Sequence, residues 1–121
     1  MLENYSIAKK LLDVAHAKHQ AIASNISNVE TPGYKRQDIN VDFDAQLRKL
    51  AQNDDVQSIQ NLDFQVITDL ATPSVRADGN NVQLDKELLN MSQNSVQYEY
   101  LTNYVSNSLK QIETAIKGQV V

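Results

Sequence analysis

The chain has 121 residues and a formal net charge of −4, and it contains no cysteine and only three glycines. Its length is that of one ordinary domain, and its acidity disfavours binding to nucleic acids or to anionic membrane surfaces. The missing cysteines exclude disulfides and thiolate metal sites, and the scarce glycines exclude a Gly-rich phosphate loop.

The first predicted element is a long helix within residues 1–30. Apolar, small or histidine side chains recur there at alternating spacings of three and four residues, the heptad seam of a helix packed lengthwise against another helix. The seam consists of Tyr5, Ala8, Leu12, Ala15, His19, Ile22, Ile26 and Val29. A second stripe of Ile7, Leu11 and Val14 widens the apolar face. The first residues form neither a basic nor an apolar leader, so we expect no cleaved secretory signal.

A turn is predicted directly after this helix, at residues 31–34, which read Thr-Pro-Gly-Tyr. Pro32 cannot continue the helical hydrogen bonds and favours an extended Thr31, while Gly33 can take the positive φ of a type II turn. Two asparagines lie just upstream. Asn28 can bond to nearby backbone as the helix unwinds, and Asn25 can do the same toward a neighbouring chain.

The middle segment, residues 31–83, is irregular and polar. We expect a short helix from Asp42 to Gln52, capped by Asp42, with Phe43, Leu47 and Leu50 on one face. A short strand is expected at residues 64–68, and turns at residues 72–73 and 78–81. The composition predicts no core of its own, so this segment should either lean on the long helices or be partly mobile.

The last predicted element is a helix over residues 84–118, roughly 50 Å long. Its seam again follows the spacings of four and three: Leu84, Leu88, Met91, Ser95, Tyr98, Thr102, Val105, Leu109, Ile112 and Ile116. Asp85 is the expected cap, and Leu84 and Leu89 can form a hydrophobic staple. Lys117 suits the negative helix end, and Gly118 suits a left-handed terminal residue.

These elements predict a mainly α fold in one domain, with two long helices paired as a hairpin or coiled coil. Each helix would bury one seam. The second stripes would stay partly exposed and mark contacts with other chains: Ile7, Leu11 and Val14 on the first helix, and Leu89, Val96 and Tyr100 or Leu101 on the second. We therefore expect self-association, with helices that order fully only on assembly.

Few residues suggest chemistry. Asp13, His16 and His19 have a spacing that permits a metal site, but no fourth ligand is near them in the sequence, and a seam role explains His19 better. The acidic pairs of residues 42 and 44 and of residues 54 and 55 lack an apolar pocket that would shift a pKa. The tyrosines at 98, 100 and 104 fit helix packing better than base stacking in an acidic protein. We predict no enzyme, no cofactor, no metal and no small-molecule substrate.

Residues 23–35 resemble the N-terminal signature of the flagellar axial proteins, the family of rod, hook and hook–filament junction subunits. Members end a helix in Ala-Asn-Ile-Ala-Asn and continue into Thr-Pro-Gly-Tyr; this chain has Ala-Ser-Asn-Ile-Ser-Asn, with Ser24 and Ser27 as departures. Residues 78–87, which read Asp-Gly-Asn-Asn-Val-Gln-Leu-Asp-Lys-Glu, are similar to the start of the C-terminal helix in the proximal-rod members of that family. The short chain also fits, since distal-rod and hook proteins carry extra β-rich domains.

The resemblance implies a subunit of the rod, exported through the flagellar type III apparatus without a cleaved signal and located in the basal body within the cell envelope. Implied partners are other rod subunits, the rod–ring junction protein and the membrane ring. We expect the assembly contacts at Leu12, Ile22, Asn25, Ile26, Asn28, Thr31, Pro32, Gly33, Tyr34, Leu88, Met91, Tyr98, Val105, Leu109, Ile112 and Ile116. The alternative, a coiled-coil adaptor or export chaperone, explains the seams but not the junction at residues 25–34.

Overall fold

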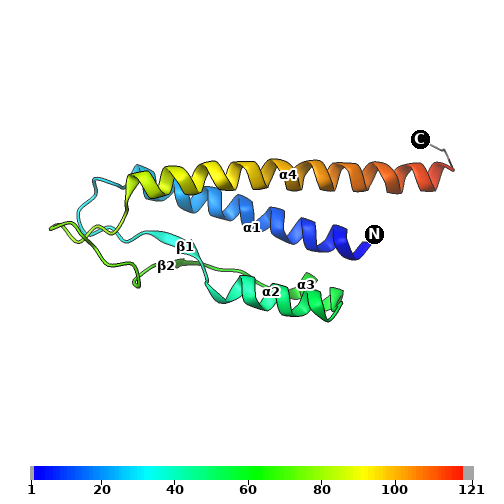
Figure 1. Cartoon of the computed structure of the whole chain (residues 1–121), viewed down its shortest axis with the longest axis horizontal. Coiled ribbons are helices and arrows are strands. Elements are labelled where there is room, and N and C mark those ends of the chain that lie inside the picture. Colours follow the sequence, from blue (N-terminus) through cyan, green and yellow to red (C-terminus); the bar gives the residue numbers. More distant parts are fainter. Residues whose placement is uncertain (1, 119–121) are drawn as a thin grey trace.

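The structure, a computed structural model, describes residues 2–118 and is mainly helical, as predicted. Its elements are α1 (Leu2–Ser27), β1 (Gln37–Ile39), α2 (Asp42–Gln52), α3 (Val56–Asn61), β2 (Val66–Thr68) and α4 (Leu84–Lys117). They form three layers: α4 lies on one side of α1, and the short strands with α2 and α3 lie on the other (Figure 1). The long N- and C-terminal helices are therefore confirmed.

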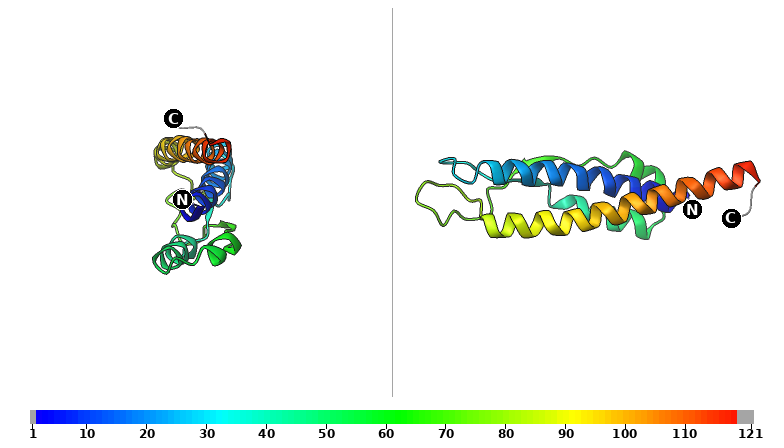
Figure 2. Two further views of the ribbon diagram at one scale, coloured as in Figure 1. Left: turned by 90° about the vertical axis from the view of Figure 1, so that its right-hand side faces the viewer. Right: turned by 90° about the horizontal axis from the view of Figure 1, so that it is seen from above.

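The two long helices run antiparallel, side by side, as the predicted hairpin (Figures 1 and 2). The buried residues of α1 on this contact include the seam members Ala8, Ala15 and Ile22, each seven residues from the next. The buried residues of α4 follow the same interval: Glu87, Asn94, Leu101 and Ser108. Ala8, Ala15 and Leu101 form one apolar cluster. A heptad of one helix therefore packs along a heptad of the other.

The α4 heptad that faces α1 is not the predicted seam, and this part of the prediction is wrong. Leu88 and Leu109, for example, each come directly after a buried residue of α4 and stay about half exposed. The small Ala8 and Ala15 let the helices approach closely, and hydrogen bonds make buried Glu87 and Asn94 tolerable there. A prediction based on apolar side chains alone therefore identified the wrong heptad of α4 as the one that faces α1.

The middle segment packs on the second stripe of α1. This agrees with the expectation that it leans on the long helices. Val14 is buried with Ile39, Phe43, Leu47 and Ile59, and Ile7 and Leu11 pack against this cluster. The rings of Phe43 and Phe64 meet edge to face with centroids 5.9 Å apart. The expectation that Ile7, Leu11 and Val14 face other chains is thus wrong in the main, because their own chain covers most of this stripe.

The local predictions for the middle segment were mixed. α2 has the predicted bounds, with Phe43 and Leu47 buried, and β2 lies within the predicted strand. β1, which pairs antiparallel with β2, and α3 were not predicted. The predicted helix caps Asp42 and Asp85 are wrong. The N-cap of α2 is Val41 and that of α4 is Gln83, and neither side chain makes a capping hydrogen bond.

Two glycines adopt the predicted left-handed backbone. Gly33 has φ +73° in the turn after α1, and Gly118 has φ +68° at the C-terminal end of α4. The last turns of α4 extend past the N-terminal end of α1 (Figures 1 and 2). Within residues 2–118, no helix combines the length and apolarity needed to cross a membrane.

Candidate assembly surface

Asn25, near the end of α1, is fully buried and pairs with the backbone of Gln37 as a neighbouring strand would. Its Nδ2 donates to the carbonyl of Gln37 (2.9 Å), and its Oδ1 accepts from the N–H of Gln37 (2.7 Å). Nδ2 also donates to Oε2 of Glu87 at 3.3 Å, and the hydroxyl of Tyr34 donates to Oδ1 at 3.1 Å. Asn25 therefore joins α1, β1 and α4 of its own chain, and its contact with a neighbouring chain stays a prediction.

The turn after α1 is tied down by side-chain amides. Asn28 donates to the carbonyl of Ser24 at 2.8 Å, a bond to nearby backbone as predicted. Buried Asn80 donates to the carbonyls of Asn28 and Thr31, both at 2.9 Å. The N–H of Gly33 donates to the carbonyl of Asp78 at 2.8 Å. The segment before α4 thus fixes the segment after α1.

Arg36 is the centre of a half-buried charge cluster between the sheet and α4. Its Nε lies 2.9 Å from Oε1 of Glu87, and its Nη1 lies 2.6 Å from Asp69 and 3.1 Å from Asp38. Burial alone would lower the pKa of Arg36, but the bonds to Glu87 and Asp69 reverse this and raise it. The bond from Thr72 lowers the pKa of Asp69, and Arg36 adds to this effect. The cluster holds the first turns of α4 in place.

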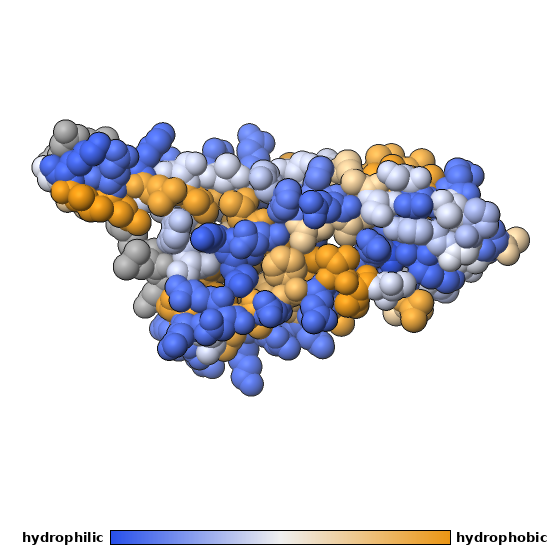
Figure 3. All heavy atoms as spheres, turned by 180° about the vertical axis from the view of Figure 1, so that it is seen from behind, coloured by the Kyte–Doolittle hydropathy of each residue, from blue (hydrophilic) through white to orange (hydrophobic). Residues whose placement is uncertain are grey.

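The predicted seam of α4 forms a mainly apolar, partly exposed stripe beside the line of residues that faces α1, and we call this stripe the open seam. It comprises Leu84, Leu88, Met91, Ser95, Tyr98, Thr102, Val105, Leu109, Ile112 and Ile116, and its exposed apolar members have exposed fractions of 40–81%. Hydrophobic atoms lie along the projecting end of α4, at the left of Figure 3. A regular exposed stripe of this kind is what a second helix packs against.

A surface groove brings the seams of both long helices together. It has a volume of about 300 Å³ and is lined by His16 and His19 of α1 and by Asn94, Ser95 and Tyr98 of α4. His19, Ser95 and Tyr98 are predicted seam residues, so the two seams border the same open face. In the part of the chain from residue 2 to 118, no group of three or more His, Asp or Glu side chains is placed to hold a metal ion.

The predicted contact residues fall into three groups. Ile22 is buried, and Leu12 and Ile26 are half-buried along α1. Tyr34 and Asn28 are half-buried in the junction, whereas residues 31–33 are exposed at one end of the molecule. The α4 residues are exposed or half-buried on the open seam: Leu88, Met91, Tyr98, Val105, Leu109, Ile112 and Ile116.

Several residues that fix this surface are not evident from the sequence pattern. Glu87 and Asn94 were not expected to be buried because both are polar, although their seven-residue interval with Leu101 was visible. The pattern around Asn80 and Asn81 predicts only a turn. Asn81 accepts from the N–H of Arg36 at 2.7 Å and donates to the carbonyl of Asp69 at 2.8 Å. Asparagine side chains that bond to backbone groups elsewhere in the chain follow no periodic pattern in the sequence.

Comparison with known proteins gives a consistent result, although no protein-family model matches the chain. The "Flagellar basal body rod protein FlgB" of Borrelia hermsii is 32% identical over 135 residues, covering 92% of this chain and 93% of the relative. The protein of the same name from Buchnera aphidicola is 24% identical over 125 residues and covers 94% of each chain. That of Escherichia coli K12 is 28% identical over 120 residues and covers 84% of each.

Proposed function

Because this chain belongs to the FlgB family of flagellar basal body rod proteins, we propose that it is a structural subunit of the proximal rod, the drive shaft between the motor ring and the hook. Its terminal helices pack against those of neighbouring subunits and build a torque-bearing tube around a central channel. It acts by assembly and carries out no catalysis. Its place is the basal body, within the cell envelope.

The open seam is the observation that carries this proposal. Burying the side chain of a Leu or Ile contributes about 1.5–3 kcal/mol, and a half-exposed one has roughly half of this still to gain. Several such residues repeat along α4, which can offset the cost of association of about 4–15 kcal/mol. A contact between different surfaces of two copies does not close on itself, so repetition yields an open helical assembly.

The fold supports a load-bearing role. α4 is one uninterrupted helix of 34 residues with neither Pro nor Gly inside it. Its first turns are tied by Glu87 to Asn25 and Arg36, so α1, β1 and α4 meet at one fixed point. Continuous helices with a locked junction transmit torque without bending at a loop.

The proposed partners are other copies of this chain, the other rod subunits, the rod–ring junction protein and the membrane ring. Export through the flagellar type III apparatus, without a cleaved signal, brings the subunit to its site. A subunit of this kind must not polymerise before export. An assembly surface made of helices, whose ends order fully only against neighbours, satisfies this requirement.

Mass spectrometry of purified hook–basal bodies from the source organism tests the proposal. We expect this chain in the particles at a few copies each, and its deletion should leave cells without rods and non-motile. Re-expression of the wild-type gene is the control. Absence of the chain from intact particles, in cells that express it, would contradict the proposal and favour an adaptor or export chaperone.

A further inference from the structure

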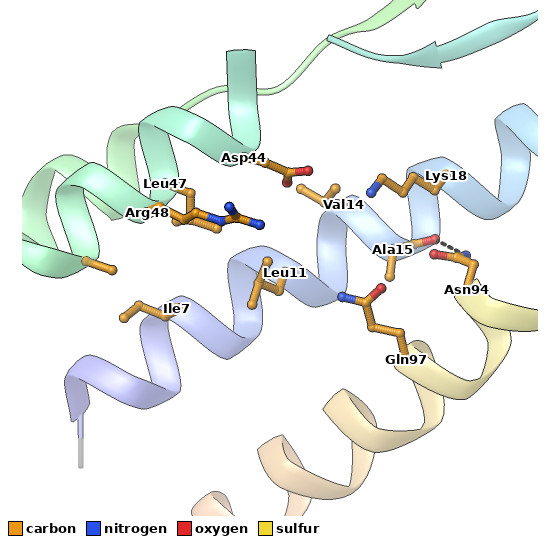
Figure 4. A pocket seen from close by; sticks show the side chains of 11 residues that line it. Ile7, Leu11, Val14, Ala15, Lys18, Asp44, Leu47, Arg48, Asn94 and Gln97 are labelled. Carbon is orange, nitrogen blue, oxygen red and sulfur yellow. Dashed lines mark hydrogen bonds between the residues drawn. The ribbon is translucent and has the colours of Figure 1, made fainter. Parts of the chain in front are cut away.

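The middle segment has two surfaces that its own fold leaves uncovered. One is a groove of about 420 Å³ beside α1 and α2, with Leu11 and Val14 in its apolar lining and Asp44 and Arg48 among its charged groups (Figure 4). Because this groove mixes apolar groups with charges of both signs, it selects no single class of occupant. The other surface is the outer edge of β2, where the uncovered groups are backbone N–H and C=O groups. Such groups accept an extended chain.

The outer edge of β2 follows from the hydrogen bonds of the two-stranded sheet. The N–H of Asn40 donates to the carbonyl of Gln65 at 2.9 Å, and the register places Val66 opposite Ile39. Residues that pair directly in an antiparallel ladder alternate between bonded and non-bonded pairs. The N–H and C=O groups of Val66 and Thr68 therefore point away from β1. Among the described residues, no backbone group outside the sheet bonds to them.

The opposite edge of the sheet, on β1, is closed by side chains. The amide of Asn25 bonds both the N–H and the carbonyl of Gln37, and the N–H of Ile39 donates to Oδ1 of Asp38 at 2.8 Å. In Figure 1, β1 lies between α1 and β2. A further strand can therefore join the sheet only beside β2.

The side chains along this free edge are exposed and largely apolar. All three residues of β2 are exposed, with exposed fractions of 47% for Val66 and 38% for Ile67. Leu70, two residues after the strand, is 77% exposed. An uncovered strand edge with apolar side chains is a template for pairing with another chain. A two-stranded ribbon also gains stability when more strands join it.

β2 is complementary to β2 of a second copy. Full antiparallel overlap of the two strands places Ile67 opposite Ile67 of the second copy, and Val66 opposite Thr68 of the second copy. Each outward-pointing residue then donates one hydrogen bond and accepts one. Directly after the strand, Asp69 comes opposite Gln65, so this register opposes no two like charges. The second copy therefore matches the edge in backbone pairing, in apolar contact and in charge.

We propose that two free subunits pair through their β2 edges and form a two-fold dimer with a four-stranded sheet, in the order β1–β2–β2–β1. The closed edges of β1 prevent further growth, so the contact yields dimers and no fibre. The proposal goes beyond the proposed function, because a two-fold contact cannot repeat along a shaft whose subunits all point the same way. The dimer belongs to the free subunit and separates before the subunit joins the rod. Its small interface makes it a transient dimer.

Disulfide trapping of purified protein tests the dimer, because the chain contains no cysteine of its own. In Ile67→Cys the two thiols are directly opposite in a non-bonded pair, whose Cα atoms lie about 4.5 Å apart, within reach of a disulfide. The matched control is Val66→Cys, whose side chain is the more exposed of the two. Its counterpart in the second copy is offset by two residues, about 7 Å along the strand, and out of reach. After mild oxidation at high protein concentration, a non-reducing gel should show at least about tenfold more covalent dimer for Ile67→Cys.

A second variant tests whether backbone pairing holds the dimer. Thr68→Pro removes an N–H that points away from β1, and proline is tolerated at such edge positions. Ile67→Cys/Thr68→Pro should therefore keep the fold, as checked by circular dichroism, and lose most of the covalent dimer. Equal dimer yields for Ile67→Cys and Val66→Cys would overturn the proposal, and so would an undiminished yield in a folded proline variant. If the proline variant fails to fold, the comparison of the two cysteine variants decides alone. None of these results bears on the rod assignment, because they concern the free subunit.

Discussion

A single side-chain amide holds three segments of this protein together at Asn25. Its two polar atoms pair with the N–H and carbonyl of Gln37 and also contact Glu87 and Tyr34. Helices rarely join a strand through hydrogen bonds, because their own backbone groups are already paired. The Asn25 amide gives α1 one donor and one acceptor that pair with the backbone of β1, as a neighbouring strand would. This explains why an asparagine stands at position 25.

We predict that Asn25→Ala lowers the free energy of unfolding by about 2–4 kcal/mol, because it leaves the buried groups of Gln37 and Glu87 without partners. Urea denaturation followed by circular dichroism measures this. Asn28→Ala is the control and should cost less than about 1 kcal/mol, since the carbonyl of Ser24 keeps its bond from the N–H of residue 28. Equal losses in the two variants would contradict the role given to Asn25.

The charge cluster predicts a pH dependence. The pKa of Asp69 is lowered in the folded state, so its contribution to stability is complete above the pKa of an unfolded Asp, about 3.9, and is lost as pH falls below it. The melting temperature should therefore fall more steeply below about pH 4 in the wild type than in Asp69→Asn. Parallel acid profiles for the two proteins would show that the bonds that the Asp69 carboxylate receives from Thr72 and Arg36 do not contribute.

At the scale of residues, the sequence indicates where the important asparagines lie but not which groups they bind. The unusual density of asparagines before the Thr-Pro-Gly-Tyr turn marked residues 25 and 28 correctly as a specified junction. The partners of Asn25 lie 12 and 62 positions away, in β1 and α4, and nothing in a local pattern indicates them. Arg36 and Asn80 were missed for the same reason.

At the scale of elements, periodicity predicted both long helices, α2 and β2, but not which face of α4 turns inward. A heptad pattern finds the most apolar line of a helix, whereas burial here follows the line that meets small residues of α1 and satisfied polar groups. The result is informative, since much of the most apolar line of α4 stays exposed. β1 and α3 are three and six residues long, too short for a periodic signal.

The turn after α1 depends on the backbone of Gly33 and not on space around it. A Cβ at this position would meet nothing within 4 Å, but φ is +73°. We predict that Gly33→Val destabilises the protein by about 1–3 kcal/mol, because a β-branched residue resists this conformation. Gly33→Asn, which tolerates positive φ, should retain most of the stability. Thermal unfolding of both variants checks this, and equal losses would point to a different cause.

For the whole molecule, the separation of the inward heptad from the open seam allows folding and assembly to be tested independently. Leu101 is buried against α1, so Leu101→Ala should lower the free energy of unfolding by about 2–4 kcal/mol. Leu109 is about half exposed, and Leu109→Asp should change it by less than about 1 kcal/mol.

Leu109→Asp should nevertheless abolish incorporation into basal bodies and swimming, because a charge would enter an apolar contact between subunits. Asn103→Asp, an exposed change on α4 outside the open seam, is the control for added charge. Motility assays and immunoblots of isolated particles report the result. Normal swimming of the Leu109→Asp strain would show that this part of the open seam carries no essential contact.

The same division predicts how order is distributed in the free subunit. Residues 109–118 project beyond α1, and an isolated helix of about ten residues is marginal in water. The turns of α4 around Asn94 and Leu101 are instead held against Ala15 and Ala8. Hydrogen exchange at low protein concentration should therefore find the amides of residues 109–118 at least about 100-fold less protected than those of residues 94–101. In assembled particles the two regions should be protected alike, because each then packs against protein. Equal protection already in the free subunit would mean that the end of α4 is ordered without a neighbour, and assembly would then be controlled elsewhere.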